Sequence, residues 1–319
     1  MDLRAGVRQL ISTGYISHMW LPWRDAVWLA LGLAVVAAVM RVRVPPRRWL
    51  WVRDLAREGA IFSILYATWQ VVGRLSRNDL SKAVTHGRAI ASLEHAVHLP
   101  SEEWAQHLAL HSHLIIKAAN WYYIAGHTPV LGIFLVWLYV RHRPDFARWR
   151  TVLAVGTIVG ELIQVYAVAP PRLALFDIVD TMRAYGPRVY SDDGAGFAPQ
   201  LGAMPSLHCV WAIITGAAVF SIVRSRWRWI GPAHAVATVL VVVVTGNHYW
   251  ADALAAIPLV LLGLAVADMS AYLWRPGRRV TDEVPSAAPA NRRVTPTLAS
   301  RGRISRPLNG AHRADSPQQ

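Results

Sequence analysis

The stretch Thr-Gly-Asn-His-Tyr-Trp-Ala-Asp, residues 245–252, separates two apolar runs at 229–246 and 252–272. A helix of about 20 apolar residues is long enough to cross a lipid bilayer, so we expect the stretch to lie at a membrane surface. His248 and Asp252 are four residues apart, a spacing that places both side chains on one face of a helix. A carboxylate there holds a neutral imidazole in one tautomer and stabilises its charged form. The pair therefore fits a histidine nucleophile, and a plain surface ion pair is the alternative.

The composition is typical of a membrane protein. Of the 319 residues, 54% are hydrophobic and 16% are charged, whereas soluble domains carry about 25% charged residues. The apolar runs favour one polytopic membrane domain over two soluble ones. The single cysteine, Cys209, excludes an intramolecular disulfide framework, and its position inside an apolar run predicts a buried side chain.

The chain is strongly basic, with a formal net charge of +14 and a pI near 10.8. Such a balance is common in nucleic-acid-binding proteins. Here, however, the arginines occupy short segments between the apolar runs and the C-terminal tail, as the positive-inside rule predicts for membrane proteins. We therefore attribute the charge to membrane topology and to attraction for anionic lipid headgroups, and we expect no nucleic-acid partner.

The apolar runs predict an all-α, polytopic membrane helical bundle of about eight spans, with six or seven as alternatives. The first run begins near Ala26 and is expected to be an uncleaved span rather than a signal peptide. The expected spans are residues 25–41, 59–73, 108–125, 128–141, 150–169, 207–223, 229–246 and 252–272.

The basic segments predict the orientation of the bundle. Three arginine clusters, at 141–150, 224–228 and 275–279, fall on one side when spans lie between them, and the rule makes this side cytoplasmic. The C-terminus is then cytoplasmic, and the loops 170–206 and 245–251 lie on the exoplasmic face of a multi-pass cell-membrane protein. The arginines between residues 41 and 57 depart from this pattern, because an eight-span count places them outside.

Arg172 follows Pro170 and Pro171 at the end of an apolar run. The two prolines end the helix and stiffen the exit of the chain. An arginine at this depth is either a snorkelling side chain or a bidentate ligand for a phosphate group.

The segment Met-Pro-Ser-Leu-His, residues 204–208, opens another apolar run. Ser206 is the expected N-cap, and His208 falls in the first helical turn. The N-terminus of a helix favours an anion, since it offers free N–H groups and positive potential. The segment is either a capped membrane helix with an interfacial histidine or a phosphate site with His208 as general acid.

In this order, the motifs Pro-Pro-Arg, Pro-Ser-Leu-His and Gly-Asn-His-Tyr-Trp-Ala-Asp resemble those of the type 2 phosphatidic acid phosphatase superfamily. The pattern is most similar to the inositol phosphorylceramide synthase-like branch, which contains inositolphosphotransferases. The three motifs cover residues 169–252. The region around Glu94 and the segment 120–127 also resemble that branch and extend the likeness over about 85–272.

The resemblance implies a membrane lipid phosphatase or phosphotransferase with a two-step mechanism. His248 attacks phosphorus and forms a phosphohistidine, while Asp252 orients and balances the imidazole. His208 protonates the leaving oxygen, and Arg172 and Ser206 bind the phosphoryl oxygens. Water or an alcohol then releases the phosphate. The implied partner is a lipid phosphate, and no metal or other cofactor is expected.

The chain departs from the wider superfamily at positions where phosphate-binding cations are expected. Val165 occupies the position of a lysine, and Val241 and Val242 occupy those of a Ser-Arg pair. Asn247 is expected to bind phosphate by hydrogen bonding. The other candidates to replace the missing groups are a hydroxyl and two basic side chains: Thr245, Lys117 and Arg183.

We expect three parts in the chain. Residues 1–84 form N-terminal spans and a basic loop, residues 85–274 form the phosphatase-like catalytic membrane domain, and residues 275–319 form a disordered basic tail. The tail is rich in Pro, Ser, Ala and Arg and shows no periodicity.

Two other functions remain open at this level. One is a non-catalytic membrane transporter or lipid-binding protein on the same helical frame, which the missing cations favour. The other is a metal-dependent hydrolase, because Glu103, His107 and His111 are spaced along one helical face with His113 nearby, in a pattern that could bind zinc.

Overall fold

The computed structural model describes residues 21–43, 46–75, 79–187 and 200–273. The described residues contain helices and no strand, and their one isolated bridge pairs Val168 with Gly202. This confirms the predicted all-α fold. The tail expected to be disordered, 275–319, lies outside the described residues.

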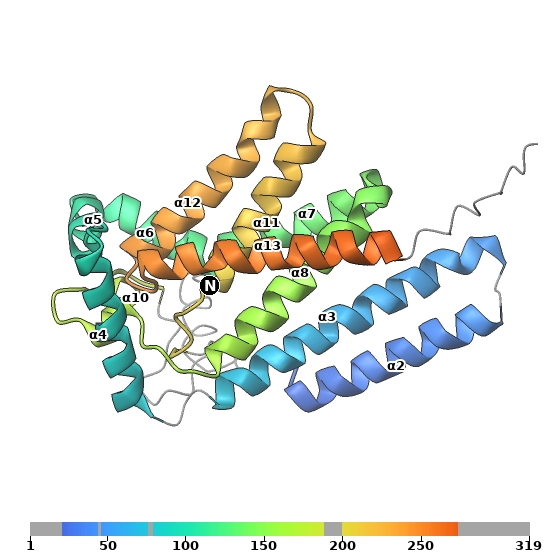
Figure 1. The fold of residues 1–319 in the computed structure, drawn as a ribbon, viewed down its shortest axis with the longest axis horizontal. Coiled ribbons are helices and arrows are strands. Elements are labelled where there is room, and N and C mark those ends of the chain that lie inside the picture. The colour runs from blue at the N-terminus through green and yellow to red at the C-terminus, as the bar shows by residue number, and fades with distance from the viewer. Residues whose placement is uncertain (1–20, 44–45, 76–78, 188–199, 274–319) are drawn as a thin grey trace, which may run out of the picture. The chain divides into compact units, whose positions relative to one another are not determined.

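The N-terminal part is a hairpin of two long helices. Helix α2 (Trp23–Val42) and helix α3 (Leu50–Leu75) pack against each other (Figure 1). Helix α2 is apolar along most of its length and leaves large side chains such as Trp28 exposed. Helix α3 also packs against α8 (Arg143–Gln164), which connects the hairpin to the rest of the bundle.

Two shorter helices follow, and both start at a polar cap. Helix α4 (Leu80–Ala96) begins after Asp79, whose side chain accepts the Lys82 N–H. Helix α5 (Glu102–Leu110) begins after Ser101, whose hydroxyl accepts the Trp104 N–H at 3.1 Å and caps the helix.

The next span is one continuous helix of three parts. Helix α6 (His113–Trp121), the π-helical turn η4 (Tyr122–Gly126) and helix α7 (His127–Arg141) together make a 29-residue stretch. The prediction of separate spans at 108–125 and 128–141 was therefore wrong. The chain does not break at Gly126, because this residue keeps a helical conformation and the π turn carries the helix onward.

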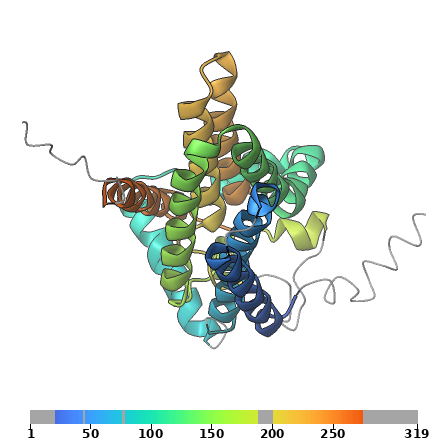
Figure 2. The same cartoon turned by 90° about the vertical axis from the view of Figure 1, so that its right-hand side faces the viewer.

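The C-terminal half supplies most of the core. Helix α8 packs against α11 (Leu207–Ile222) and α13 (Trp250–Leu273), and α11 packs along α12 (Ile230–Val244), as both views show (Figures 1 and 2). Two short helices, α9 (Pro171–Ala174) and α10 (Thr181–Tyr185), lie in the connection from α8 to α11, and η5 (Arg226–Trp229) precedes α12. Cys209 is fully buried in this core, as predicted.

The helices have the length and surface of membrane spans. Four described helices are long and apolar enough to cross a bilayer: Trp23–Val42, His113–Arg141, Arg226–Val244 and Trp250–Leu273. Helix α11 is apolar but has 16 residues, and α3 and α8 have 26 and 22 residues with several charges. Large apolar side chains point outward, among them Ile133 at 70% exposure and Val140 at 65%. This surface is typical of helices in contact with lipid, and the chain is a membrane protein.

Ion pairs gather the basic segments at one end of the bundle. Arg143, at the start of α8, pairs with Asp54 near the start of α3, and Arg150 pairs with Glu58 at 2.7 Å. The 41–57 segment therefore lies beside the 141–150 cluster. The eight-span count, which placed the two on opposite sides, was wrong because it divided the His113–Arg141 helix.

Close contact between α11 and α12 gives a test of the packing. A Cβ atom on Gly216 would lie 2.8 Å from the Gly231 carbonyl oxygen, whereas a Cβ on Gly132 of α7 would meet nothing within 4 Å. We expect Gly216→Leu to lower the free energy of unfolding by about 1–3 kcal/mol or more, since the two helices must separate. Gly132→Leu is the matched control and should leave the thermal unfolding temperature in detergent nearly unchanged. Equal unfolding temperatures for the two variants would contradict this packing.

Candidate active site

A sharp turn between α12 and α13 forms the centre of the site. Gly246 adopts a positive φ of 70°, and a Cβ atom there would lie 2.8 Å from Ile178. The N–H groups of Asn247 and His248 both bond to the Val242 carbonyl at 3.1 Å. The turn is thus wound back onto the end of α12, and it directs His248 toward the interior.

His248 and Asp252 form a buried pair, as their spacing predicted. The Asp252 carboxylate lies 3.2 Å from Nδ1 of His248, and the Ala203 carbonyl oxygen lies 2.8 Å from the same nitrogen. The exposed fractions of the two residues are 5% and 0%. Because the carbonyl can only accept, Nδ1 carries the hydrogen, and Nε2 keeps a lone pair that is available to an electrophile.

Residues 201–203 are held in place to make this contact. Val168 donates to the Leu201 carbonyl at 2.7 Å, and Ala203 donates back to the Val168 carbonyl at 3.1 Å. This short bridge fixes the Ala203 carbonyl beside His248. The tautomer of the imidazole is therefore set by the segment that precedes α11, and that segment is held in turn by Val168, which follows α8.

Arg172 is buried beside the turn. Its backbone N–H donates to the Gly246 carbonyl, and its Nε donates to Asn247 Oδ1 at 3.0 Å. Its Nη1 forms an ion pair with Asp180 at 3.2 Å, and only 2% of the side chain is exposed. The alternative of a snorkelling arginine is therefore wrong, since the charge is directed into the protein rather than toward a membrane surface.

Ser206 and His208 stand at the start of α11, next to the start of α13. Ser206 is the N-cap, as predicted, and its hydroxyl accepts the Cys209 N–H at 3.3 Å. Its own N–H donates to the Asp252 carbonyl, which ties the two helix starts together. The ring of His208 lies 5.7 Å from that of His248, centroid to centroid, so both imidazoles reach one small volume.

The sequence patterns did not assign a function to two aromatic residues from the π-helical turn region. Tyr123 stacks on His208 with the ring centroids 4.4 Å apart. His127 is 1% exposed, stacks on Trp211, and neither ring nitrogen has a hydrogen-bond partner among the described residues. The motif 120–127 drew attention to this segment, but only the fold shows that its rings meet His208.

Of the residues expected to replace the missing cations, two lie in the turn itself. Asn247 is buried and donates to the Thr245 hydroxyl at 2.9 Å. Lys117 and Arg183 are exposed. Val242 is fully buried in the core. Arg172 and the polar groups of the turn therefore supply the positive and hydrogen-bonding potential near His248.

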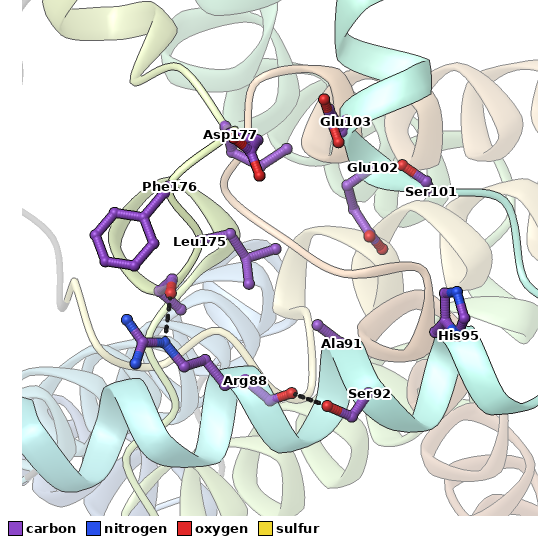
Figure 3. Close-up of a pocket in the computed structure, with 12 residues that line it drawn as sticks. Arg88, Ala91, Ser92, His95, Ser101, Glu102, Glu103, Leu175, Phe176 and Asp177 are labelled. Carbon is purple, nitrogen blue, oxygen red and sulfur yellow. Dashed lines mark hydrogen bonds between the residues drawn. The ribbon is translucent and has the colours of Figure 1, made fainter.

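The proposed zinc pattern does not assemble in the described part of the chain. His107 and His111 face each other on α5 and the following turn, with ring centroids 4.8 Å apart. Glu103 instead lines a surface pocket next to Glu102 (Figure 3). Within the described ranges, no three His, Cys, Asp or Glu residues are grouped so that they could hold a metal ion.

Burial sets the charge state of the central imidazole. Desolvation, opposed by the Ala203 carbonyl and reinforced by the nearby Arg172 guanidinium, lowers the pKa of His248 to about 4. The imidazole is therefore neutral at pH 7, as a nucleophile must be.

Together, these features define a helical membrane protein with a buried acid–base site at one end of its bundle. Residues 88–266, more than half of the chain, match the PAP2 superfamily, and the chain belongs to this superfamily. Membership supports phosphatase-type chemistry on a lipid phosphoester. The comparisons with curated proteins and with solved structures gave no match.

Asp252→Asn tests the His248–Asp252 pair. The amide would place an N–H₂ group or a weaker acceptor against Nδ1–H and would disturb the tautomer. We expect kcat to fall about 10³–10⁴-fold, the order seen when a buried carboxylate beside a catalytic histidine is replaced by its amide. Asp268→Asn, an exposed change on the same helix, is the control in a phosphate-release assay with a lipid phosphate. Similar kcat values for the two variants would argue against the pair.

The pH dependence of kcat/KM tests the charge state of His248. Protonation removes the nucleophile, and the lowered pKa predicts that activity persists below pH 6.5 and falls toward about pH 4. Arg172→Gln removes a cation that lowers this pKa, so the acid limb should move to higher pH. Arg148→Gln, at the opposite end of α8, should leave the limb in place. An acid limb that is the same in all three proteins would contradict the assignment.

Proposed function

We propose that the protein is a membrane lipid phosphatase or phosphotransferase that cleaves a lipid-linked phosphoester through a phosphohistidine on His248. One observation carries this proposal: a neutral, oriented His248–Asp252 pair lies beside a second histidine, His208, and a buried arginine, Arg172. Phosphoryl transfer depends mainly on positioning and charge stabilisation, and these four residues provide both.

In the first step, Nε2 of His248 attacks phosphorus, and the bond from phosphorus to the ester oxygen breaks. His208 gives its proton to the leaving oxygen. Arg172, Asn247 and the N–H groups at the start of α11 stabilise the phosphoryl oxygens, with Ser206 at the same helix start. Asp252 balances the positive charge that develops on the imidazole.

In the second step, His208 takes a proton from an incoming hydroxyl group. The oxygen attacks phosphorus, and the bond between phosphorus and Nε2 of His248 breaks. Water as the incoming group makes the protein a phosphatase, and a lipid alcohol makes it a transferase. The likeness to the inositol phosphorylceramide synthase-like branch favours transfer of an inositol phosphate type headgroup as the finer assignment.

The site is proposed to open on the exoplasmic side of the cell membrane. Two of the basic segments lie together at the opposite end of α8 from the site, where Arg143 and Arg150 pair with residues of α3. With His113–Arg141 as one span, the arginines of 41–57 join the cytoplasmic side, in agreement with the positive-inside rule. Asp268, near the end of α13, pairs with Arg148 at that end of α8, so the C-terminus is proposed to be cytoplasmic.

The 85–274 region is accordingly proposed as the catalytic domain, with 1–84 as an accessory hairpin.

The membrane depth of the site fits a lipid substrate. Helix α11 starts in the site and has 16 residues, which span about 24 Å at about 1.5 Å per residue. A bilayer core is about 30 Å thick, so His208 lies within reach of a headgroup phosphate.

His248→Ala and His208→Ala test the proposal against a non-catalytic transporter or lipid-binding protein. Phosphate release from a panel of lipid phosphates by purified protein should fall below detection in the first variant, and by at least about 100-fold in the second, as expected for general acid–base catalysis. His111→Ala, an exposed histidine, should keep full activity. Unchanged turnover in both site variants would reject the enzyme assignment. Lipid binding without turnover by any of the proteins would favour the transporter or lipid-binding alternative.

A further inference from the structure

Two carboxylates that lie far from α13 in the sequence accept hydrogen bonds from the backbone at the start of this helix. Glu94 of α4 accepts the Ala251 N–H at 2.6 Å, and Glu102 of α5 accepts the Trp250 N–H at 3.3 Å. Both residues are buried, with 3% and 6% exposure. The two amides lie between His248 and Asp252 in the sequence, so the pair acts directly on the turn that carries the site.

The start of α13 attracts negative charge but cannot hold three charges at once. A helix N-terminus has free N–H groups and a positive potential, which acidic side chains satisfy. Asp252 already accepts the Tyr249 N–H at 2.9 Å. Three carboxylates packed together in a buried place repel one another, and loss of solvation opposes each charge. A proton retained within the group relieves this repulsion.

The proton belongs on Glu94. Burial, and then the neighbouring Glu102 carboxylate, raise the pKa of Glu94 to about 8. Its second oxygen, Oε2, is buried without a hydrogen-bond acceptor or donor among the described residues. A hydrogen on that oxygen would let it donate to Glu102.

Arg88 and His95 line the same pocket as Glu102, but Arg88 donates to the Ala174 carbonyl and neither basic side chain pairs with the glutamates in the described residues. The titratable groups that act on Glu94 come from α5 and from the start of α13: Glu102, Tyr249 and Asp252. In the described residues, neither glutamate takes part in an ion pair with Lys, Arg or His. The charge of the pair is therefore set by its proton rather than by a counterion.

A surface pocket reaches one member of the pair, Glu102. Glu102 projects from the start of α5 into a cavity of about 570 Å³ whose other ionisable lining residues are Glu103, Asp177, Arg88 and His95 (Figure 3). On its other side, Glu102 contacts the Trp250 amide. Glu102 therefore lies between the pocket and the start of α13, and His248 is not among the residues that line the pocket.

We propose that Glu94 and Glu102 are positioning residues that share one proton and thereby fix the start of α13 and the His248–Asp252 geometry. The inference rests on the proposed function, because it describes regulation of the same site. At a pH below that at which the shared proton is released, the two glutamates together carry one negative charge and hold the start of α13 firmly. Above it, a second charge repels Asp252 and loosens the turn, so activity falls as the pH rises.

Substitutions at Glu94 separate positioning from a general structural effect. Glu94→Gln keeps an oxygen for the Ala251 N–H and stays neutral, so kcat should stay near wild type at pH 7 and the alkaline fall should disappear. Glu94→Ala removes the acceptor, and kcat should fall about 10–100-fold with little change in KM, as for other residues that orient a catalytic group. Glu103→Gln, the exposed neighbour in the same pocket, should keep the wild-type kcat and pH profile.

The proposal is overturned if Glu94→Gln retains the wild-type alkaline limb, or if it loses as much activity as Glu94→Ala. Infrared difference spectroscopy gives a readout that does not need a substrate. At pH 7, the C=O band of a protonated carboxyl group should be present in wild type and in Glu103→Gln, and reduced in Glu94→Gln. An unchanged band in Glu94→Gln would exclude the proton. If wild type hydrolyses no lipid phosphate while the band behaves as expected, the proposed function fails and the shared proton stands.

Discussion

The site depends on the hydrogen bonding of His248 Nδ1 to the Ala203 carbonyl and to the Asp252 carboxylate. It requires three segments to meet: the 201–203 bridge, the start of α13 and the tight turn at Gly246. The starts of α11 and α13 are also joined directly, because the Asp252 backbone carbonyl accepts the N–H of Ser206, the N-cap of α11. Burial of the pair keeps the imidazole neutral and leaves Nε2 as its reactive atom.

The rest of the fold supports this contact from both ends of the bundle. At the site end, Arg172 bonds to Asn247 and to the Gly246 carbonyl, and Glu94 and Glu102 satisfy the amides that open α13. At the opposite end, ion pairs such as Arg150 with Glu58 join α8 to the N-terminal hairpin. A helical frame fixed at the far end lets the site contain buried charges that would otherwise be costly.

Sequence patterns predicted the features that depend on interactions between residues close together in the chain. The apolar runs at 229–246 and 252–272 correspond to α12 and α13, Ser206 caps α11 as predicted, and His248 and Asp252 are in contact as their spacing indicated. The continuous His113–Arg141 helix was missed, because hydropathy does not show that a π turn can carry a helix past Gly126. The contacts of Glu94 and His127 were also beyond prediction, since their partners lie far away in the sequence and only tertiary packing brings them together.

The central claim is that phosphorus becomes bonded to His248 during turnover. The most direct measurement is rapid acid-free quenching of the wild-type protein with a lipid phosphate labelled on phosphorus, followed by peptide mapping of the acid-labile label. The account predicts label on the peptide that carries His248, and its loss when an acceptor is allowed to react. Label on a different residue, or steady turnover with no labelled peptide at any quench time, would contradict it.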